Sequence, residues 1–179
     1  MRTQQKTGDT TEKLVQQKLE SLGFLVEQGP DKKSVDLVVA HPDRPNTWLN
    51  IQVKGRGKTQ TNERYRWFQL RMTERQRLDA CEMGLSLEDA WRPKVDKCDF
   101  FILVSLKHNE LWVFHKDEVA ELIELNKTRY GNWTEWKKGI KVEMDLDIEV
   151  NGTPLTTIFK KNKNNFDKIE TALLNSISS

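Results

Sequence analysis

The sequence predicts an α/β domain in which helices flank a central mixed β-sheet. Stretches with apolar residues at helical spacing alternate along the chain with short runs rich in β-branched and aromatic residues. The 179 residues, of which 36% are hydrophobic and 31% are charged, suffice for one well-cored domain and are few for two. We therefore expect residues 1–179 to form a single domain.

The first expected element is a helix over residues 9–22. Val15, Leu19 and Leu22 recur at helical spacing and give this helix one buried stripe, and Gly23 can end it. Three strands should follow, separated by a turn-rich break and by the loop HPDRPN, at residues 24–26, 34–40 and 48–54. The chain is thus expected to begin with a helix and three consecutive strands.

The middle of the chain predicts a strand, a helix and a β-hairpin. Apolar residues alternate over residues 65–72, as in a strand with one buried face. Thr73-Glu74-Arg75-Gln76 has the spacing of a capping box, so a helix should run from there to Met83. The strongly apolar residues 99–106 should be a buried strand, with a hairpin partner at residues 111–114.

The last third of the chain predicts two helices around one long strand. The helices are expected over residues 116–125 and 165–177. Residues 140–150 alternate between apolar and polar side chains, which indicates one half-buried strand before an Asn151-Gly152 turn. The acidic residues of this strand should form a solvated face: Glu143, Asp145, Asp147 and Glu149.

Two acidic residues fall at positions where their elements should bury them. Asp36 lies among apolar strand residues, where an unpaired carboxylate is costly and a cation is a good partner. The alternative is that Asp36 caps a turn near Ser34. Glu12 lies on the buried stripe of the first helix, so it should point at the sheet. Alternatively, Asp9-Thr10-Thr11-Glu12 is a capping box, in which Glu12 bonds the Asp9 amide.

The strand LNIQVKGRG, residues 49–57, carries a polar face. Side chains alternate with period two, so Gln52 and Lys54 should point away from the face of Ile51 and Val53. A half-exposed strand without any function would show the same alternation. The alternation indicates a functional site only together with Asp36 and Glu12, which lie on the neighbouring elements.

The order of these elements resembles the PD-(D/E)XK nuclease superfamily, which has the restriction-endonuclease-like fold. A helix with Glu12 is followed by a strand, a strand with Asp36, a strand with Gln52 and Lys54, a helix and a strand. The resemblance covers residues 8–115. It implies an αβββαβ core with a central mixed sheet flanked by helices.

Within this superfamily the chain looks most like the Holliday-junction-resolvase branch. The similarity runs from Lys54 through the capped helix at Thr73 to the strand at residues 99–106. Residues 116–179 would be a C-terminal α/β extension, to which the resemblance assigns no role.

The resemblance also implies a catalytic site that binds one or two Mg²⁺ ions, with Mn²⁺ as an alternative. In the family, a lysine stabilises charge at the scissile phosphate, and Lys54 would have this role. Pro30-Asp31 supplies a literal PD sequence, but in a turn five residues early, so Asp36 is preferred. Gln52 departs from the family pattern, which has a carboxylate there. The implied metal ligands are Glu12, Asp36, Gln52 and the backbone carbonyl of Val53.

Basic residues cluster after this strand. From Lys54 to Arg77 there are eight basic residues against Glu63 and Glu74, which makes a local positive field that phosphates would feel. The alternative is a solvated surface with no ligand. The candidate contacts to the DNA backbone are Arg56, Lys58, Arg64, Arg66, Arg71 and Arg75.

Composition favours a cytoplasmic protein with no membrane partner. No apolar run approaches the roughly 18–20 residues that span a bilayer, and MRTQQKTGDTTE lacks the apolar region of a secretory signal. Cys81 and Cys98 have neither metal-type spacing nor a disulfide framework, so we expect them to be reduced.

The resemblance implies a Mg²⁺-dependent DNA endonuclease of the restriction, homing or junction-resolving type. Its substrate would be duplex or branched DNA. To cut both strands it would act as a homodimer or a larger homo-oligomer. The alternative is a non-catalytic DNA-binding accessory module that keeps the nuclease fold, because Gln52 removes one carboxylate from the site.

Overall fold

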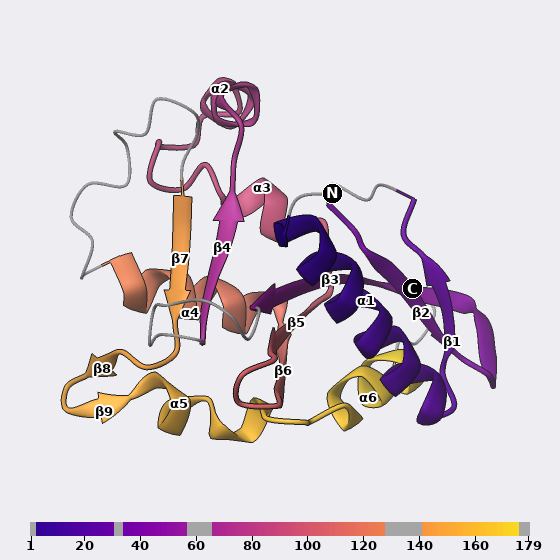
Figure 1. Cartoon of the computed structure of the whole chain (residues 1–179). Coiled ribbons are helices and arrows are strands. Elements are labelled where there is room, and N and C mark those ends of the chain that lie inside the picture. The colour runs from indigo at the N-terminus through magenta and orange to yellow at the C-terminus, as the bar shows by residue number, and fades with distance from the viewer. Residues whose placement is uncertain (1–2, 31–33, 57–65, 128–140, 176–179) are drawn as a thin grey trace.

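The computed structural model describes residues 3–30, 34–56, 66–127 and 141–175 (Figure 1). The first elements are α1 (Thr3–Ser21), β1 (Leu25–Gln28), β2 (Leu37–His41), β3 (Arg44–Arg56), β4 (Trp67–Arg71) and α2 (Glu74–Glu82). They are followed by α3 (Arg92–Val95), β5 (Phe100–Ser105), β6 (Glu110–His115), α4 (Lys116–Lys127) and β7 (Lys141–Asp145). The last are β8 (Glu149–Val150), β9 (Thr153–Pro154), α5 (Leu155–Ile158), the 3₁₀ helix η1 (Lys160–Asn162) and α6 (Asp167–Asn175).

Five strands form the central sheet, in the order β1-β2-β3-β5-β6. β3 and β5 are parallel, with Ile51 opposite Phe100, and the other neighbouring strands are antiparallel. The predicted mixed sheet and the predicted β5–β6 hairpin are therefore confirmed. β4 and β7 pair with each other in a separate antiparallel ribbon, which stands beside the central sheet in Figure 1.

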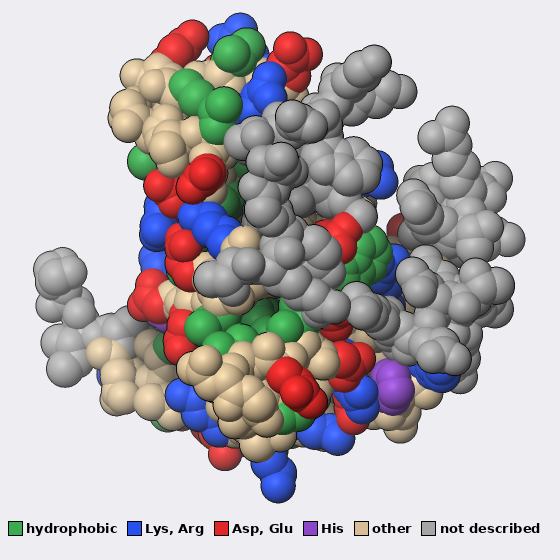
Figure 2. Space-filling model, turned by 90° about the vertical axis from the view of Figure 1, so that its left-hand side faces the viewer, with side chains coloured by type: hydrophobic (Ala, Val, Ile, Leu, Met, Phe, Trp, Pro, Cys, Tyr) green, Lys and Arg blue, Asp and Glu red, His purple; other side chains and the backbone are tan. Residues whose placement is uncertain are grey.

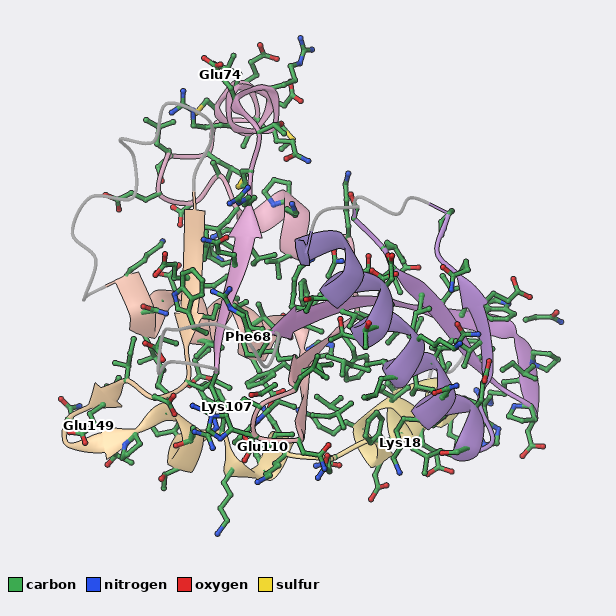
Figure 3. The ribbon with its side chains drawn as sticks, viewed as in Figure 1. Lys18, Phe68, Glu74, Lys107, Glu110 and Glu149 are labelled. Atoms are coloured by element: carbon green, nitrogen blue, oxygen red, sulfur yellow. The ribbon has the colours of Figure 1, made fainter. Side chains whose placement is uncertain are left out.

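Helices cover both faces of the central sheet. α1 and α6 lie over one face, where Val15 and Leu19 of α1 and Ile169 and Leu173 of α6 enter one core (Figure 1). α4 and the β4–β7 ribbon cover the other face, and Phe68 lies between β4 and the sheet (Figure 3). The C-terminal third thus contributes to both layers. None of the described helices is long and apolar enough to span a membrane.

The hairpin between β2 and β3 is tighter than predicted. The prediction of a loop over residues 41–46 is wrong. β2 continues to His41, and β3 already begins at Arg44, the residue that pairs with His41. The strand expected over residues 34–40 begins only at Leu37. β3 therefore has 13 residues where β2 has five.

The single long strand expected over residues 140–150 is also wrong. The Asp145 carboxylate accepts a hydrogen bond from the Asp147 amide over 3.1 Å, and this local turn ends β7. Asp145 is buried, and Glu143 accepts a hydrogen bond from the Trp67 indole over 2.5 Å. The predicted solvated acidic face is therefore only half formed, because Asp147 and Glu149 are exposed whereas Asp145 is buried and Glu143 is half-buried.

Two local signals in the sequence are confirmed. Thr73 and Gln76 form the expected capping box, in which Gln76 N donates to Thr73 Oγ1 over 3.2 Å and Thr73 N donates to Gln76 Oε1 over 3.0 Å. Asn151 and Gly152 both have positive φ angles in the turn between β8 and β9. α3 and α5 were not expected, because four residues are too few to show helical periodicity.

An ion-pair network joins the start of β4 to the central sheet. Arg66 Nε donates to Glu110 Oε2 over 2.7 Å, and Arg66 Nη1 donates to Asp147 Oδ1 over 2.9 Å. Glu110, labelled in Figure 3, also accepts from Lys163 Nζ over 2.8 Å. Burial by itself would raise the pKa of Glu110, but hydrogen bonds from Arg66 and Lys163 outweigh burial and lower the pKa to about 2.

The lowered pKa of Glu110 predicts acid-sensitive stability. Its charge stabilises the fold above the unfolded pKa, and this contribution is lost as the pH falls through that value toward the folded pKa of about 2. We expect Glu110→Gln to lower the free energy of unfolding at pH 7 by about 1–3 kcal/mol. The decline in stability between about pH 5 and pH 2 should be shallower in the variant. Urea unfolding measures both effects, and identical pH dependence in the two proteins would contradict the prediction.

Candidate active site

The site lies on the edge of β3 that extends beyond its pairing with β2. β2 begins at Leu37 opposite Ile51, whereas β3 continues to Arg56 with β5 along its other side. Among the described residues, no strand pairs with this edge of β3 beyond Ile51. We call residues 52–56 the open edge.

Asp36 marks the point where the two strands part. It directly precedes β2, and its amide donates to Ile51 O over 3.0 Å. Its side chain is only 6% exposed, and Oδ2 accepts hydrogen bonds from Val53 N over 2.7 Å and from Gln52 Nε2. Asp36 is thus held by β3, and the alternative that it caps a turn near Ser34 is wrong.

Gln52 is as deeply buried as Asp36 and makes direct contact with it. Its side chain is 2% exposed, and its amide nitrogen donates to the Asp36 carboxylate. The amide nitrogen therefore faces Asp36 in this state. For the amide oxygen to bind a cation next to Asp36, the Gln52 side chain has to rotate.

Lys54 lies two residues further along β3, on the same side as Gln52. Ile51 and Val53 belong to the core beneath α1, so Gln52 and Lys54 point to the opposite face of the sheet. Burial lowers the pKa of Lys54, while the negative charges of Asp36 and Glu12 act in the opposite direction. Within the described chain, the Lys54 ammonium makes no hydrogen bond or ion pair.

Glu12 reaches this site from α1. The capping-box alternative is wrong, because α1 begins at Thr3 and Asp9 lies inside the helix. Val15 is buried beneath the same helix, as the predicted stripe requires, and Glu12 is half-buried. Glu12 follows Thr11, which meets Gly55 on β3, and the negative charge of Glu12 acts to raise the pKa of Lys54.

A glycine lets α1 approach the open edge closely. A Cβ atom on Gly55 would lie 2.4 Å from both Oγ1 and Cγ2 of Thr11, far inside van der Waals contact. Thr11 is buried, and its hydroxyl donates to Thr7 O over 3.0 Å. Gly55 therefore sets the distance between α1 and β3 at Thr11, the residue next to Glu12, a role that the sequence pattern did not reveal.

The fold brings two further residues to Lys54 that sequence analysis missed. Cys98 is buried, its thiol donates to Ser34 O over 3.1 Å, and burial raises its pKa to about 12. Lys94 on α3 lies close enough for the charge of Lys54 to lower its pKa. No motif in the sequence connects Lys94 with the strand that precedes it by 40 residues.

The expected DNA contacts divide into three groups. Lys58 and Arg64 lie outside the described residues. The guanidinium group of Arg66 is held by Glu110 and Asp147, so Arg66 has a structural role, and its predicted DNA contact stays a prediction. The remaining three are Arg56, Arg71 and Arg75.

Arg56 is partly enclosed, whereas Arg71 and Arg75 are exposed. The Arg56 guanidinium lies 3.7 Å from the centre of the Trp67 ring, and its Nε donates to Trp67 O over 2.5 Å. Burial lowers the pKa of Arg56 to about 10. Arg75 pairs with Asp79, one turn along α2. Figure 2 shows acidic and basic side chains side by side over the described part of the β4–β7 side of the molecule.

The donor atoms at this site fit a hard divalent cation. Within the described chain, no cluster of three or more His, Cys, Asp and Glu side chains could hold a metal ion. A site here would therefore use the carboxylates of Asp36 and Glu12, completed by neutral oxygens. The N–H of Val53 faces Asp36, so its carbonyl oxygen lies on the same open edge, and the Gln52 amide adds another oxygen. Oxygen donors of this kind suit Mg²⁺, which also retains several waters.

The sequence matches no family model and no curated protein. A solved structure does match, that of the bacterial homing endonuclease I-Ssp6803I. It is 14% identical in sequence, with a TM-score of 0.55, and the match covers 99% of this chain and 100% of that chain. The chain has the restriction-endonuclease-like fold.

A second solved structure is the Holliday junction resolvase Hjc of Archaeoglobus fulgidus, at 12% identity and a TM-score of 0.38. That match covers 86% of this chain and 95% of the resolvase. The restriction-endonuclease-like fold that the order of elements implies is confirmed by the match to the homing endonuclease. The roles of Asp36, Gln52, Lys54, Glu12 and Val53 in metal binding and catalysis stay predictions.

The close approach at Gly55 predicts a sharp difference between two glycine substitutions. Gly55→Ala should lower the free energy of unfolding by about 1–3 kcal/mol, because the new methyl group pushes Thr11 and α1 away from β3. Gly8→Ala is the matched control, since its Cβ atom would meet nothing closer than Glu12 Oε1 at 3.9 Å. The control should fold as well as the wild type or slightly better. Equal stability of the two variants in urea unfolding would show that this contact is not close.

Proposed function

We propose that this protein is a Mg²⁺-dependent endonuclease that hydrolyses phosphodiester bonds in DNA. The observation that carries the proposal is the buried Asp36 carboxylate, held by Gln52 and Val53 on the strand that also presents Lys54. Burial of a carboxylate beside a half-buried lysine is costly for folding, which favours a function for both groups. The nuclease named among its structural neighbours, a homing endonuclease, supports this class of activity.

Each residue of the site has a distinct role in this proposal. The carboxylates of Asp36 and Glu12 hold the cation, with the Gln52 amide oxygen and the Val53 carbonyl as neutral ligands. A bound Mg²⁺ ion would supply an activated water and neutralise charge on the phosphate. The Lys54 ammonium stabilises the negative charge that grows on the phosphate oxygens. Its lack of an ion-pair partner within the described chain leaves it available for this contact.

Duplex DNA is the first substrate to test, and a four-way junction is the second. Cutting both strands of a duplex requires two sites, so we propose a homodimer or a larger homo-oligomer as the active form. Arg56, Arg71 and Arg75 are the described candidates for holding the DNA backbone.

One observation favours the second candidate function, a DNA-binding accessory module without catalysis. The Gln52 amide satisfies the Asp36 carboxylate by a hydrogen bond, so the site is stable without any cation. A protein that had lost its chemistry could keep such a site. The two functions differ in one measurable property, which is cleavage.

The nuclease proposal predicts metal-dependent cleavage that requires Lys54. Supercoiled plasmid and a four-way junction are incubated with Mg²⁺, Mn²⁺ or EDTA. We expect the wild type to cut only with a metal ion, and Lys54→Ala to be slower by about 10²–10³-fold, because a charge-stabilising donor is lost. Gel electrophoresis over time measures the rate.

Lys160→Ala serves as the control, because Lys160 is an exposed lysine on η1 rather than on β3. It should cut at the wild-type rate. Salt-sensitive binding without cleavage in either metal would establish the accessory module instead. Equal cleavage rates of the wild type and Lys54→Ala would show that Lys54 does not contribute to catalysis.

Gln52→Glu tests whether residue 52 is a metal ligand. The added charge should tighten Mg²⁺ or Mn²⁺ binding, measured by calorimetry without DNA. In EDTA the same variant should be less stable than the wild type by about 1–3 kcal/mol, because two carboxylates then meet in place of a hydrogen bond. Metal should restore this stability.

Gln52→Met is the matched control, since it removes the amide and adds no charge. It should lose stability in EDTA as well, but metal should restore less of that stability than in Gln52→Glu, because the variant has one ligand fewer. Unchanged metal affinity in Gln52→Glu would show that residue 52 does not contact the ion.

A further inference from the structure

A stacked pair of side chains joins the end of β3 to β4. Arg56 is the last residue of β3, and its guanidinium group lies 3.7 Å from the centre of the Trp67 ring on β4. Arg56 Nε also donates a hydrogen bond to Trp67 O over 2.5 Å. The end of β3 therefore lies beside β4, as Figure 1 shows, and both the ring and the backbone of Trp67 hold Arg56.

Trp67 is itself held in place by the β4–β7 ribbon. Its indole Nε1 donates to Glu143 Oε2 over 2.5 Å, and Glu143 belongs to β7, the other strand of the ribbon. Phe68, the next residue of β4, is buried in the core between the ribbon and the central sheet. The ring that faces Arg56 thus has a position fixed from two strands.

Arg56 belongs to the row of side chains that contains Gln52 and Lys54. Successive residues of a strand point to alternate faces, so these three side chains lie on the same face of β3. The parallel pairing with β5 continues to this point, where Arg56 is opposite Ser105. Two residues of a strand span about 6–7 Å, so the Arg56 side chain leaves the open edge about that far beyond Lys54.

Stacking on an indole ring prepares an arginine for a phosphate. A flexible arginine side chain samples many rotamers and loses this freedom when it binds a ligand. The ring and the hydrogen bond from Nε hold the Arg56 guanidinium in one plane before any ligand arrives. Because Nε–H is directed at Trp67 O, the edge of the group formed by Nη1 and Nη2 is the one that matches two phosphate oxygens.

We propose that Trp67 is a positioning residue for Arg56, which it aligns with a DNA phosphate next to the one that Lys54 contacts. This inference rests on the proposed nuclease function. The resemblance to nucleases assigns no role to Trp67. The competing explanation is that the stack only attaches the β4–β7 ribbon to the central sheet and has no part in DNA binding.

A double-mutant cycle on DNA affinity separates these two explanations. Affinity for a duplex fragment is measured in EDTA at several salt concentrations for wild type, Arg56→Gln, Trp67→Leu and the double variant. Arg56→Gln should bind about 10–100-fold more weakly, because charge-assisted hydrogen bonds are lost. The slope of log affinity against log salt should also become shallower by about 0.9.

Trp67→Leu should bind about 3–10-fold more weakly and keep the wild-type slope, because Arg56 keeps its charge. In the Arg56→Gln background, Trp67→Leu should cost no further affinity, because Trp67 acts through Arg56. Wild-type affinity in Trp67→Leu would overturn the inference. An equal loss of affinity with and without Arg56 would overturn it as well.

Arg92 is the matched control, because its guanidinium group also stacks on a tryptophan, 4.7 Å from the centre of the Trp91 ring. This second stack lies at the start of α3, where Arg92 pairs with Glu124 of α4. Arg92→Gln should keep the wild-type affinity and slope. Failure of the wild type to bind or cut DNA at all would instead overturn the proposed function itself.

A conservative variant covers the case in which Trp67→Leu does not fold. Trp67→Phe keeps a ring for stacking and should bind DNA within about 3-fold of the wild type. Its missing indole signal identifies the Trp67 N–H resonance of the wild type, which is then followed by NMR as DNA is added. This resonance should shift, whereas that of the buried Trp91 should not. An unchanged Trp67 resonance in the DNA complex would overturn the inference.

Discussion

The hydrogen bonds from β3 to the Asp36 carboxylate are the contact on which the rest of the site depends. Val53 N and the Gln52 amide both donate to one carboxylate oxygen, which is almost fully buried. Burying a neutral polar group without a hydrogen-bond partner costs on the order of 2–7 kcal/mol of folding free energy, and burying a charged carboxylate without one costs more. The contact therefore fixes the point at which the segment before β2 separates from β3, and Lys54 lies on β3 just beyond that point.

The amide at position 52 changes how this site is held together. Where two carboxylates meet, their repulsion requires a cation, so folding and metal binding become linked. Gln52 replaces that repulsion by a hydrogen bond to Asp36. The site can then fold without metal, and the cation can arrive together with DNA. A neutral residue 52 is thus compatible with a nuclease that is completed by its substrate.

Local signals in the sequence predict which helices and strands form better than they predict the residues at which these elements begin and end. The capping box at Thr73 and the apolar strand β5 depend on neighbouring residues only, and both form as expected. The end of β7 depends on a side-chain turn at Asp145, and the start of α1 six residues before Asp9 removes the expected cap. Alternation and spacing carry no information about such competing contacts.

The same limit applies to the site, where residues on strands are predictable and residues that approach from elsewhere are not. Asp36, Gln52 and Lys54 follow from strand periodicity and from a resemblance to nucleases, and they do lie together. Lys94 comes from a four-residue helix whose position is decided by the packing of Trp91 in the core. The sequence pattern alone does not show how Trp91 packs in the core.

The position of the site follows from a mismatch in strand length. β3 extends beyond the point where its pairing with β2 ends. The last residues of β3 therefore have a neighbouring strand on one side only, among the described strands. α1 approaches this edge on one face because Gly55 has no side chain, and Cys98, which follows α3, donates to Ser34 O next to Asp36 over 3.1 Å. The charge of Glu12 on α1 therefore acts on Lys54 at a place where β3 has no strand partner on one side among the described residues. The proposed nuclease would place the phosphate at this edge, since the interior of a sheet admits no phosphate group.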